Sequence, residues 1–202
     1  ILATDRGISE YEKSTLAKQF VLFDFRHHLY APLVCVKKNN LKIQVSPVQL
    51  NEDEKTFVDL LDCYMKNHDA EWKDKSLFLL RNKSKVGMGF FEAGNFYPDY
   101  ILWIDTDDKQ YISFIDPKGL MHIMPENPKI KFYKKIKDLE VRLAPSAGDK
   151  QIVLNSFIMS STRGANLREW WGMKKPSEHE AMNVYTLDDA KCIEKMIQKI
   201  FQ

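Results

Sequence analysis

The alternation of apolar and polar positions predicts a β-hairpin near the middle of the chain. Residues 96–120 contain two apolar runs, at 100–104 and 111–115, and a polar segment rich in aspartate separates them. Short apolar runs on either side of turn residues are typical of paired strands whose two faces are both largely buried. We therefore expect an antiparallel pair that is joined by the aspartate-rich turn.

Apolar residues before and after this hairpin recur at helical spacing. Asn51 and Glu54 have the spacing of a capping box, which predicts a helix that begins after Asn51 and ends near Lys66. Glu54 falls on the same face as the apolar positions of this helix, so we expect its side chain to point inward. Apolar positions also predict helices at 9–21, 129–141 and 188–201, and strands at 31–36, 41–45, 76–80, 152–160 and 184–187.

Length and composition limit the classes of protein that fit. The 202 residues suggest one domain or one domain with an extension, and we assign 1–45 to an N-terminal extension on a core at 46–202. The net charge of +2 gives no overall signal for nucleic acid, so any DNA affinity must come from local clusters. Because the chain starts at Ile1 rather than methionine, we expect it to be a piece of a longer protein.

Cysteine usage and hydropathy indicate a cytoplasmic protein without a membrane partner. Cys35, Cys63 and Cys192 are widely spaced and form no CxxC pair, which fits a reducing compartment and argues against structural zinc. We find no apolar run near the length of a membrane span and no signal peptide.

Two carboxylates mark the ends of the predicted hairpin. Asp99 lies where the first strand begins, and Asp116 lies where the second ends, followed at once by Pro117 and Lys118. Antiparallel pairing brings these two ends together, so we expect both acids and the lysine at one point. Such a group can hold a divalent metal ion and a phosphodiester. The plainer alternative is a set of strand-end charges that water solvates.

The same residues carry a resemblance to a known family. Pro98-Asp99, a strand and Asp116-Pro117-Lys118 resemble the PD-(D/E)xK nuclease signature, although proline replaces the more usual strand residue at its middle position. Segments 30–33, 46–54 and 87–119 are similar to the C-terminal endonuclease domain of type III restriction enzymes and related helicase–nuclease proteins. The resemblance implies an α/β fold with a restriction-endonuclease-like α-β-β-β-α-β core, a mixed sheet with helices on both sides.

The resemblance implies a Mg²⁺-dependent endodeoxyribonuclease, with Mn²⁺ able to substitute. Asp99, Asp116 and the carbonyl of Pro117 would then be metal ligands. Glu54 would be a third ligand or orient one through water, unless its carboxylate only caps the helix. Lys118 would stabilise developing charge and position the attacking water, or take its proton. The chain contains no phosphate-cradling loop, so we expect it to bind no nucleotide itself.

Basic residues are candidates for contacts with DNA phosphates, although a charge run is usually just a solvated face. Arg163 and Arg168 lie beside Trp170 and Trp171, which could grip a strand by charge and stacking. The competing interpretation, which we favour, packs the tryptophans in the core and leaves the arginines on the rim. The other candidates are Arg81, Lys83 and Lys85 in one loop and Lys129, Lys131, Lys134, Lys135 and Lys137 in one helix.

The expected partners follow from the resemblance. They are double-stranded DNA, an ATP-dependent helicase region outside this chain and a modification or specificity subunit, with dimerisation as one route to cutting both strands. The rival hypothesis is a catalytically inactive nuclease-fold module that binds DNA or a partner subunit. A nuclease that acts on RNA or on DNA ends would share the chemistry.

Overall fold

Five strands form one mixed, open sheet in the computed structural model of the protein. The structure describes residues 20–22, 33–36, 49–83, 87–90, 94–144 and 150–202. The strand order is β3-β4-β5-β6-β7, in which β3, β4 and β5 pair antiparallel and β6 and β7 continue the sheet parallel to β5. The strands are β3 (Ser76–Arg81), β4 (Tyr100–Asp105), β5 (Lys109–Lys118), β6 (Gln151–Ser160) and β7 (Val184–Thr186).

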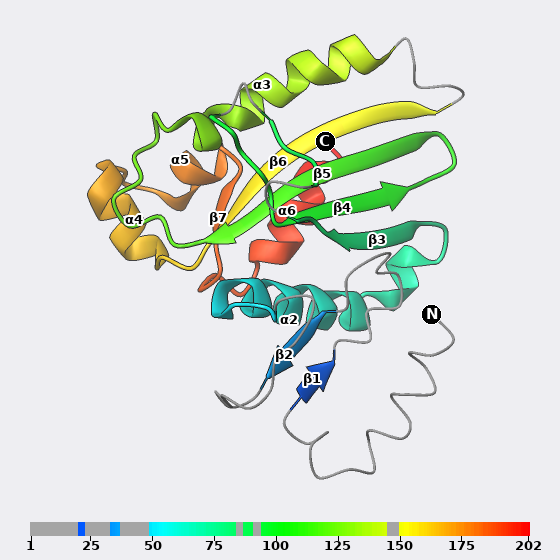
Figure 1. Cartoon of the computed structure of the whole chain (residues 1–202), viewed down its shortest axis with the longest axis horizontal. Coiled ribbons are helices and arrows are strands. Elements are labelled where there is room, and N and C mark those ends of the chain that lie inside the picture. Colours follow the sequence, from blue (N-terminus) through cyan, green and yellow to red (C-terminus); the bar gives the residue numbers. More distant parts are fainter. Residues whose placement is uncertain (1–19, 23–32, 37–48, 84–86, 91–93, 145–149) are drawn as a thin grey trace.

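Helices cover both faces of this sheet. Figure 1 looks onto the sheet, with α6 behind it, α3 above it and α2 below it. Along the chain, α2, β3, β4, β5, α3 and β6 follow one another, which is the predicted order of elements. The helical elements are α2 (Glu52–Asn67), the short 3₁₀ helix η2 (Asp69–Trp72), α3 (Pro128–Leu143), α4 (Gly164–Trp171), α5 (Pro176–Glu180) and α6 (Cys192–Ile200). The chain is therefore an α/β protein with a mixed sheet, as expected.

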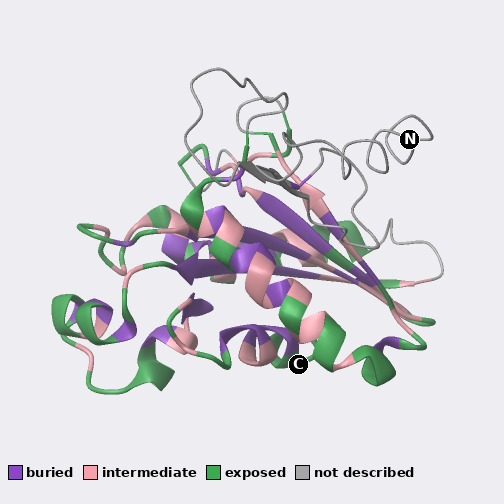
Figure 2. Cartoon of the chain, turned by 90° about the horizontal axis from the view of Figure 1, so that it is seen from below, coloured by how far each residue is buried: buried purple, intermediate pink, exposed green. Residues whose placement is uncertain are grey.

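Successive strand residues point to opposite faces, and this separates two cores. Tyr100 and Ile115 belong to the core beneath α2 and α6, where Phe57 of α2 is fully buried. Ile101 and Phe114 belong to the core beneath α3. Figure 2 shows that the central strands are largely buried. The helices in the same view alternate between buried and exposed positions along their length. Full burial of each such large apolar side chain stabilises the fold by about 1.5–3 kcal/mol.

The central hairpin forms as predicted, with one extension. Tyr100 pairs with Ile115 and Asp105 pairs with Gln110 in antiparallel register. Strand β5 then continues beyond its pairing with β4 and runs beside β6 as far as Lys118. Pro117 is tolerated there because β4 no longer pairs with β5 at this point, so that side of the strand needs no donor.

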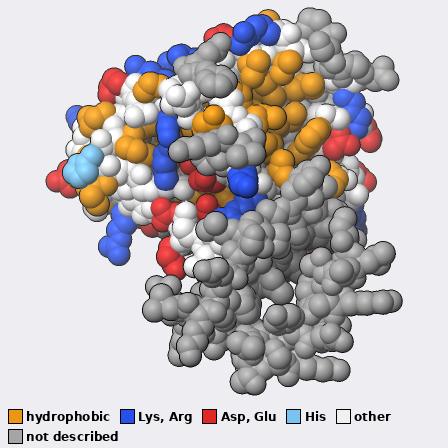
Figure 3. Space-filling view, viewed as in Figure 1, with side chains coloured by type: hydrophobic (Ala, Val, Ile, Leu, Met, Phe, Trp, Pro, Cys, Tyr) orange, Lys and Arg blue, Asp and Glu red, His pale blue; other side chains and the backbone are white. Residues whose placement is uncertain are grey.

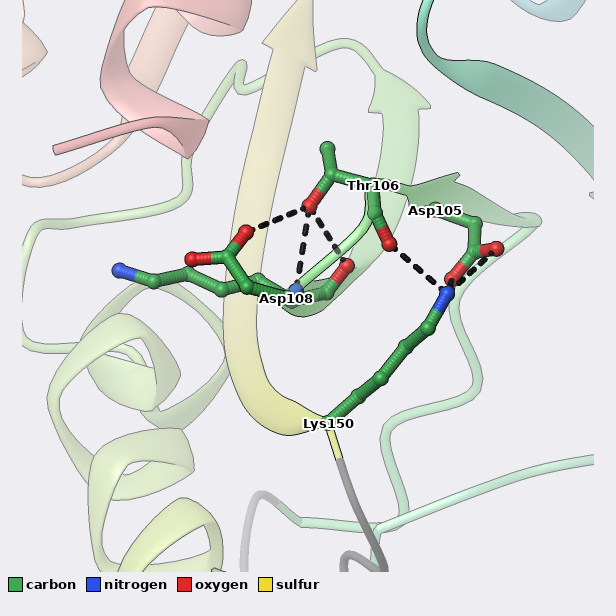
Figure 4. A network of polar contacts seen from close by, with 5 residues as sticks. Asp105, Thr106, Asp108 and Lys150 are labelled. Atoms are coloured by element: carbon green, nitrogen blue, oxygen red, sulfur yellow. Dashed lines mark hydrogen bonds and ion pairs between the residues drawn. The ribbon is translucent and has the colours of Figure 1, made fainter.

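The far end of the hairpin is fixed to the beginning of β6 by a polar network (Figure 4). Lys150 Nζ donates to both carboxylate oxygens of Asp105, at 2.9 and 3.0 Å, and to the Thr106 carbonyl at 2.8 Å. Within the turn, the Thr106 hydroxyl contacts Asp108 and accepts from the Lys109 N–H at 3.1 Å. This end holds a charge pair without any candidate chemistry, so it supplies control positions for the other end.

Helix α2 begins with the predicted capping box. The Glu54 N–H donates to Asn51 Oδ1 at 2.8 Å, and the Asn51 N–H donates back to Glu54 Oε2 at 3.1 Å. Both bonds satisfy donors that the first turn of a helix leaves without partners. The predicted inward orientation of Glu54 is also confirmed, because the residue is buried.

Little of the predicted N-terminal extension lies within the described residues. Strands β1 (Phe20–Leu22) and β2 (Val34–Val36) pair antiparallel, which confirms the end of the strand predicted at 31–36. The helix predicted at 9–21 is wrong at its end, since Phe20 and Val21 are extended and paired with β2. The rest of that helix, the strand predicted at 41–45 and the turn before it lie outside the described residues.

Two C-terminal features differ from the expected boundaries. Helix α6 starts at Cys192 rather than at 188, because Asp189 forms a turn in which its carboxylate accepts from the Lys191 N–H at 2.9 Å. Helix α5 was not predicted, since it spans only Pro176–Glu180.

No helix within the described part of the chain is both long and apolar enough to cross a membrane.

Candidate active site

Asp99 and Asp116 meet at the open end of the β4–β5 hairpin. Tyr100 and Ile115 are register partners, so the residues just beyond them, Asp99 and Asp116, face each other across the two strands. Their side chains form a hydrogen bond. The structure thus brings together the two acids that the sequence places at opposite ends of the hairpin.

A shared proton explains how two carboxyl groups come so close. Burial, the hydrogen bond to Asp116 and the negative charges of Asp116 and Glu54 together raise the pKa of Asp99 to about 8, against the lowering effect of Lys118. Near neutral pH the two carboxyl groups therefore share a proton rather than ionise together. Two acids side by side cannot both ionise without a cation to offset their repulsion.

Lys118 supplies one positive charge to this pair. Its Nζ forms an ion pair with Asp116 Oδ2, and the two side chains are 20% and 9% exposed. The same ammonium group lies 5.7 Å from the centroid of the Phe96 ring. Lys118 and Asp116 lie two residues apart on β5, so the pleat directs both side chains to the same face. The structure therefore forms the chain of contacts Asp99–Asp116–Lys118.

Glu54 reaches the same edge of the sheet from the other face. Arg81 lies on the same face of β3 as Leu77 and Leu79, which belong to the core beneath α2. Its guanidinium donates to Glu54 Oε2 at 2.9 Å and to the Gln49 carbonyl at 3.2 Å. The acid expected as a third ligand is thus held by its own cap and by Arg81, on the side opposite Asp116.

The Tyr100 hydroxyl is a part of this region that the sequence analysis did not single out. Tyr100 is fully buried, and its hydroxyl has no hydrogen-bond partner among the described residues. Burial, followed by the charge of Glu54, raises the pKa of this phenol, while Arg81 lowers it. The position directly after Asp99 was the available signal, because a strand residue next to a candidate ligand points into the neighbouring core.

Two carboxylates and a nearby lysine fit Mg²⁺ better than a softer metal. Mg²⁺ is usually held by one or two carboxylates, together with water and substrate phosphates, rather than by a complete set of protein ligands. Among the described residues, no three His, Cys, Asp or Glu side chains are arranged to hold a metal ion, so Glu54 does not complete a three-acid set. The mutual hydrogen bond of Asp99 and Asp116 is the arrangement that a bound divalent cation would replace.

A second acid connects α2 to the same edge of the sheet. The Ser161 hydroxyl, just beyond β6, donates to Asp53 Oδ2 at 2.9 Å, and the Ser161 N–H donates to the Lys118 carbonyl at 3.1 Å. Sequence analysis missed this contact because its partners lie on elements far apart in the chain. Figure 3, in the orientation of Figure 1, shows acidic and basic side chains next to one another near the middle of the view. The two Ser161 contacts connect α2 and the end of β5 at this edge of the sheet.

The residues predicted to contact DNA differ in how accessible they are. Arg81 is only 12% exposed and paired with Glu54, so its contact with phosphate would compete with an existing ion pair. Lys83 is exposed, and Lys85 lies outside the described residues. Arg163 is exposed just before α4, and Arg168 is half-buried within it. All of these contacts remain predictions.

The two tryptophans of α4 have different environments. Trp171 is 9% exposed, and its indole N–H donates to the Ile123 carbonyl at 2.8 Å. Trp170 is 41% exposed and lies nearly parallel to His122, with the ring centroids 6.5 Å apart. The expectation that tryptophans pack in the core is confirmed for Trp171 and wrong for Trp170.

Comparisons with family models, curated proteins and solved structures gave no match to this chain.

Proposed function

We propose that this chain is a Mg²⁺-dependent endodeoxyribonuclease domain of the PD-(D/E)xK type. The observation that carries the proposal is the hydrogen bond between Asp99 and Asp116 at the end of the hairpin, with Lys118 paired to Asp116. The α2-β3-β4-β5-α3-β6 order also supports a restriction-endonuclease-like core. In this proposal Asp99, Asp116 and Lys118 are the residues of the nuclease signature.

The division of roles follows from charge and position. A divalent cation held by Asp99, Asp116 and the carbonyl of Pro117 would polarise the phosphate and lower the pKa of water. Lys118, which already lies beside Asp116, orients the attacking water and offsets the negative charge that develops on the phosphate. Mn²⁺ would substitute for Mg²⁺, because both accept hard oxygen ligands.

Glu54 and Arg81 have a supporting role in this proposal. Their ion pair holds the buried Glu54 carboxylate on the opposite side of the sheet edge. From there, Glu54 acts on the metal only through water or through its charge. Arg81 holds Glu54 in place rather than binding DNA, because its guanidinium is largely buried.

The partners in the proposal come from the resemblance to type III restriction enzymes. The domain would be the C-terminal cleavage module of a restriction or helicase-linked defence protein that acts on double-stranded DNA. An ATP-dependent helicase region and a modification or specificity subunit would then supply movement and site recognition. A dimer would provide the two active sites that cutting both strands requires.

Plasmid nicking tests the proposal with matched charge pairs from the two ends of one hairpin. Asp116→Asn and Lys118→Gln should abolish the nicking of supercoiled plasmid in Mg²⁺ or Mn²⁺. Asp105→Asn and Lys150→Gln remove the corresponding charges at the far end, where the pair is 2.9 Å apart, and should leave nicking unchanged. Equal nicking by all four variants, or none by the wild-type protein in either metal, would count against the enzyme.

One observation favours the rival, a nuclease-fold module that binds DNA or a partner without turnover. Lys118 already neutralises Asp116, and Arg81 already neutralises Glu54, so within the described residues the acids have cations of their own. Such a protein would be indifferent to Mg²⁺. Plasmid binding that needs no metal and leads to no nicking would support it.

A further inference from the structure

A second lysine approaches the candidate active site from α3. Lys118 Nζ and Lys129 Nζ lie 5.7 and 5.9 Å from the centroid of the same ring, that of Phe96. Phe96 itself is fully buried and packs against Phe132 of α3. The ring therefore lies near two ammonium groups, that of Lys118 on β5, which is paired with Asp116, and that of Lys129 in the first turn of α3.

Helical geometry explains why only this lysine of α3 reaches the site. Lys129 precedes Phe132 by three residues and Ile136 by seven, and both are buried against the sheet. Residues at this spacing share a face, so the stem of Lys129 packs inward and its ammonium group emerges at the end of the helix. The other lysines of α3 are exposed, at positions 131, 134, 135 and 137.

The ammonium group of Lys129 forms no ion pair with a carboxylate of the described residues. Lys118 is paired with Asp116, whereas no carboxylate of a described residue lies within 4.0 Å of the Lys129 ammonium group. The backbone N–H of Lys129 is already satisfied by Asn127 Oδ1 at 3.0 Å. The ammonium group of Lys129, near the Phe96 ring, is therefore available to bind an anion.

We infer that Lys129 binds a backbone phosphate of the nucleic-acid substrate beside the Asp99–Asp116 pair. The inference rests on the proposed function and adds a substrate-binding residue to it. Lys118 and Lys129 flank one aromatic ring, so a strand that crosses the carboxyl pair meets both positive charges. The lysine holds the strand in place by charge and hydrogen bonding, without taking part in proton transfer.

Binding and cleavage by the 202-residue chain test this inference. A fluorescein-labelled duplex is titrated by anisotropy between about 50 and 200 mM salt, with wild type, Lys129→Gln, Lys129→Arg and Lys150→Gln. Losing one phosphate contact should lower the slope of log affinity against log salt by about 1 and weaken binding about tenfold. Lys129→Gln should show both effects and a similar loss in single-turnover cleavage. Lys129→Arg should restore them, and Lys150→Gln, which removes a lysine at the far end of the hairpin, should match wild type.

The outcomes separate this inference from the function on which it rests. Lys129→Gln that behaves as wild type, or changes by the same amount as Lys150→Gln, would overturn the role of Lys129 while cleavage persists. A wild-type protein that binds the duplex but never cleaves it would refute the nuclease, and the salt slope alone would then decide the role of Lys129. A protein that does not bind DNA at all would overturn both.

Discussion

Asp99 and Asp116 form a side-chain hydrogen bond across the open end of the β4–β5 hairpin. The contact joins two acids that would repel each other if both were ionised, and it persists because Asp99 holds a proton well above its ordinary pH range. Such a pair stabilises the fold poorly at alkaline pH, yet it is preorganised for a divalent cation.

The pH dependence of stability should report the proton on Asp99. Its pKa of about 8 in the folded protein lies above the ordinary value of 3.8, so between these values the folded state binds a proton that the unfolded chain releases. Stability should therefore fall as pH rises through this window in metal-free buffer. Asp99→Asn, which imitates the protonated acid, should remove this part of the decline and be more stable than wild type at pH 9. Parallel thermal unfolding curves for the two proteins against pH would contradict the shared proton.

Mg²⁺ or Mn²⁺ should raise the melting temperature at alkaline pH. A ligand present at about 100 times its Kd stabilises the folded state by about 2.7 kcal/mol, which corresponds to roughly 5–10 °C for a chain of this size. Asp99→Asn and Asp116→Asn should abolish the rise, whereas Asp105→Asn, at the far end of the hairpin, should keep it. A thermal-shift titration measures the effect. A rise that survives in Asp116→Asn would place the metal elsewhere.

Glu54→Gln should weaken the fold and leave metal binding intact. The amide oxygen can still accept the Asn51 N–H, but Arg81 loses the negative charge that its largely buried guanidinium faces. We expect a loss of about 2 kcal/mol in the free energy of unfolding, because the largely buried guanidinium of Arg81 loses its charge-assisted hydrogen bond to Glu54. The Mg²⁺-dependent rise in melting temperature should persist. Its loss in this variant would show that Glu54 is a direct ligand.

The two tryptophans of α4 should contribute unequally to stability. Trp171→Ala empties a buried site and removes the hydrogen bond to Ile123, so it should lower the free energy of unfolding by about 3 kcal/mol. Trp170→Ala changes an exposed side chain and should cost about 0.5 kcal/mol or less. Urea unfolding compares them. Similar losses in both variants would mean that Trp170 also packs against the core in solution.

The elements that sequence predicts best here are those with local signals. Asn51 and Glu54 predict the start of α2 because a capping box involves residues three positions apart. The hairpin follows from two apolar runs around a turn, and its register places Asp99 opposite Asp116 without further information. The acid pair was therefore predictable, since it depends on one antiparallel pairing and on the residues that flank it.

Contacts between distant elements were not predictable in the same way. Arg81 looked like part of a basic loop, yet it belongs to β3 and pairs with Glu54, 27 residues earlier in the chain. Which lysine of α3 faces the sheet edge depends on how the helix docks, which periodicity alone does not determine. Similarly, β5 extends to Lys118 because β6 pairs alongside it, and β6 is separated from β5 by α3.

The most direct test of the central claim is a crystal structure of the chain soaked in Mn²⁺ at alkaline pH, read by anomalous scattering. We predict a peak between the Asp99 and Asp116 carboxylates, within about 2.0–2.4 Å of an oxygen from each, with their mutual hydrogen bond broken. A structure in which the two carboxyl groups remain hydrogen-bonded to each other, with no peak beside them at saturating Mn²⁺, would contradict the claim.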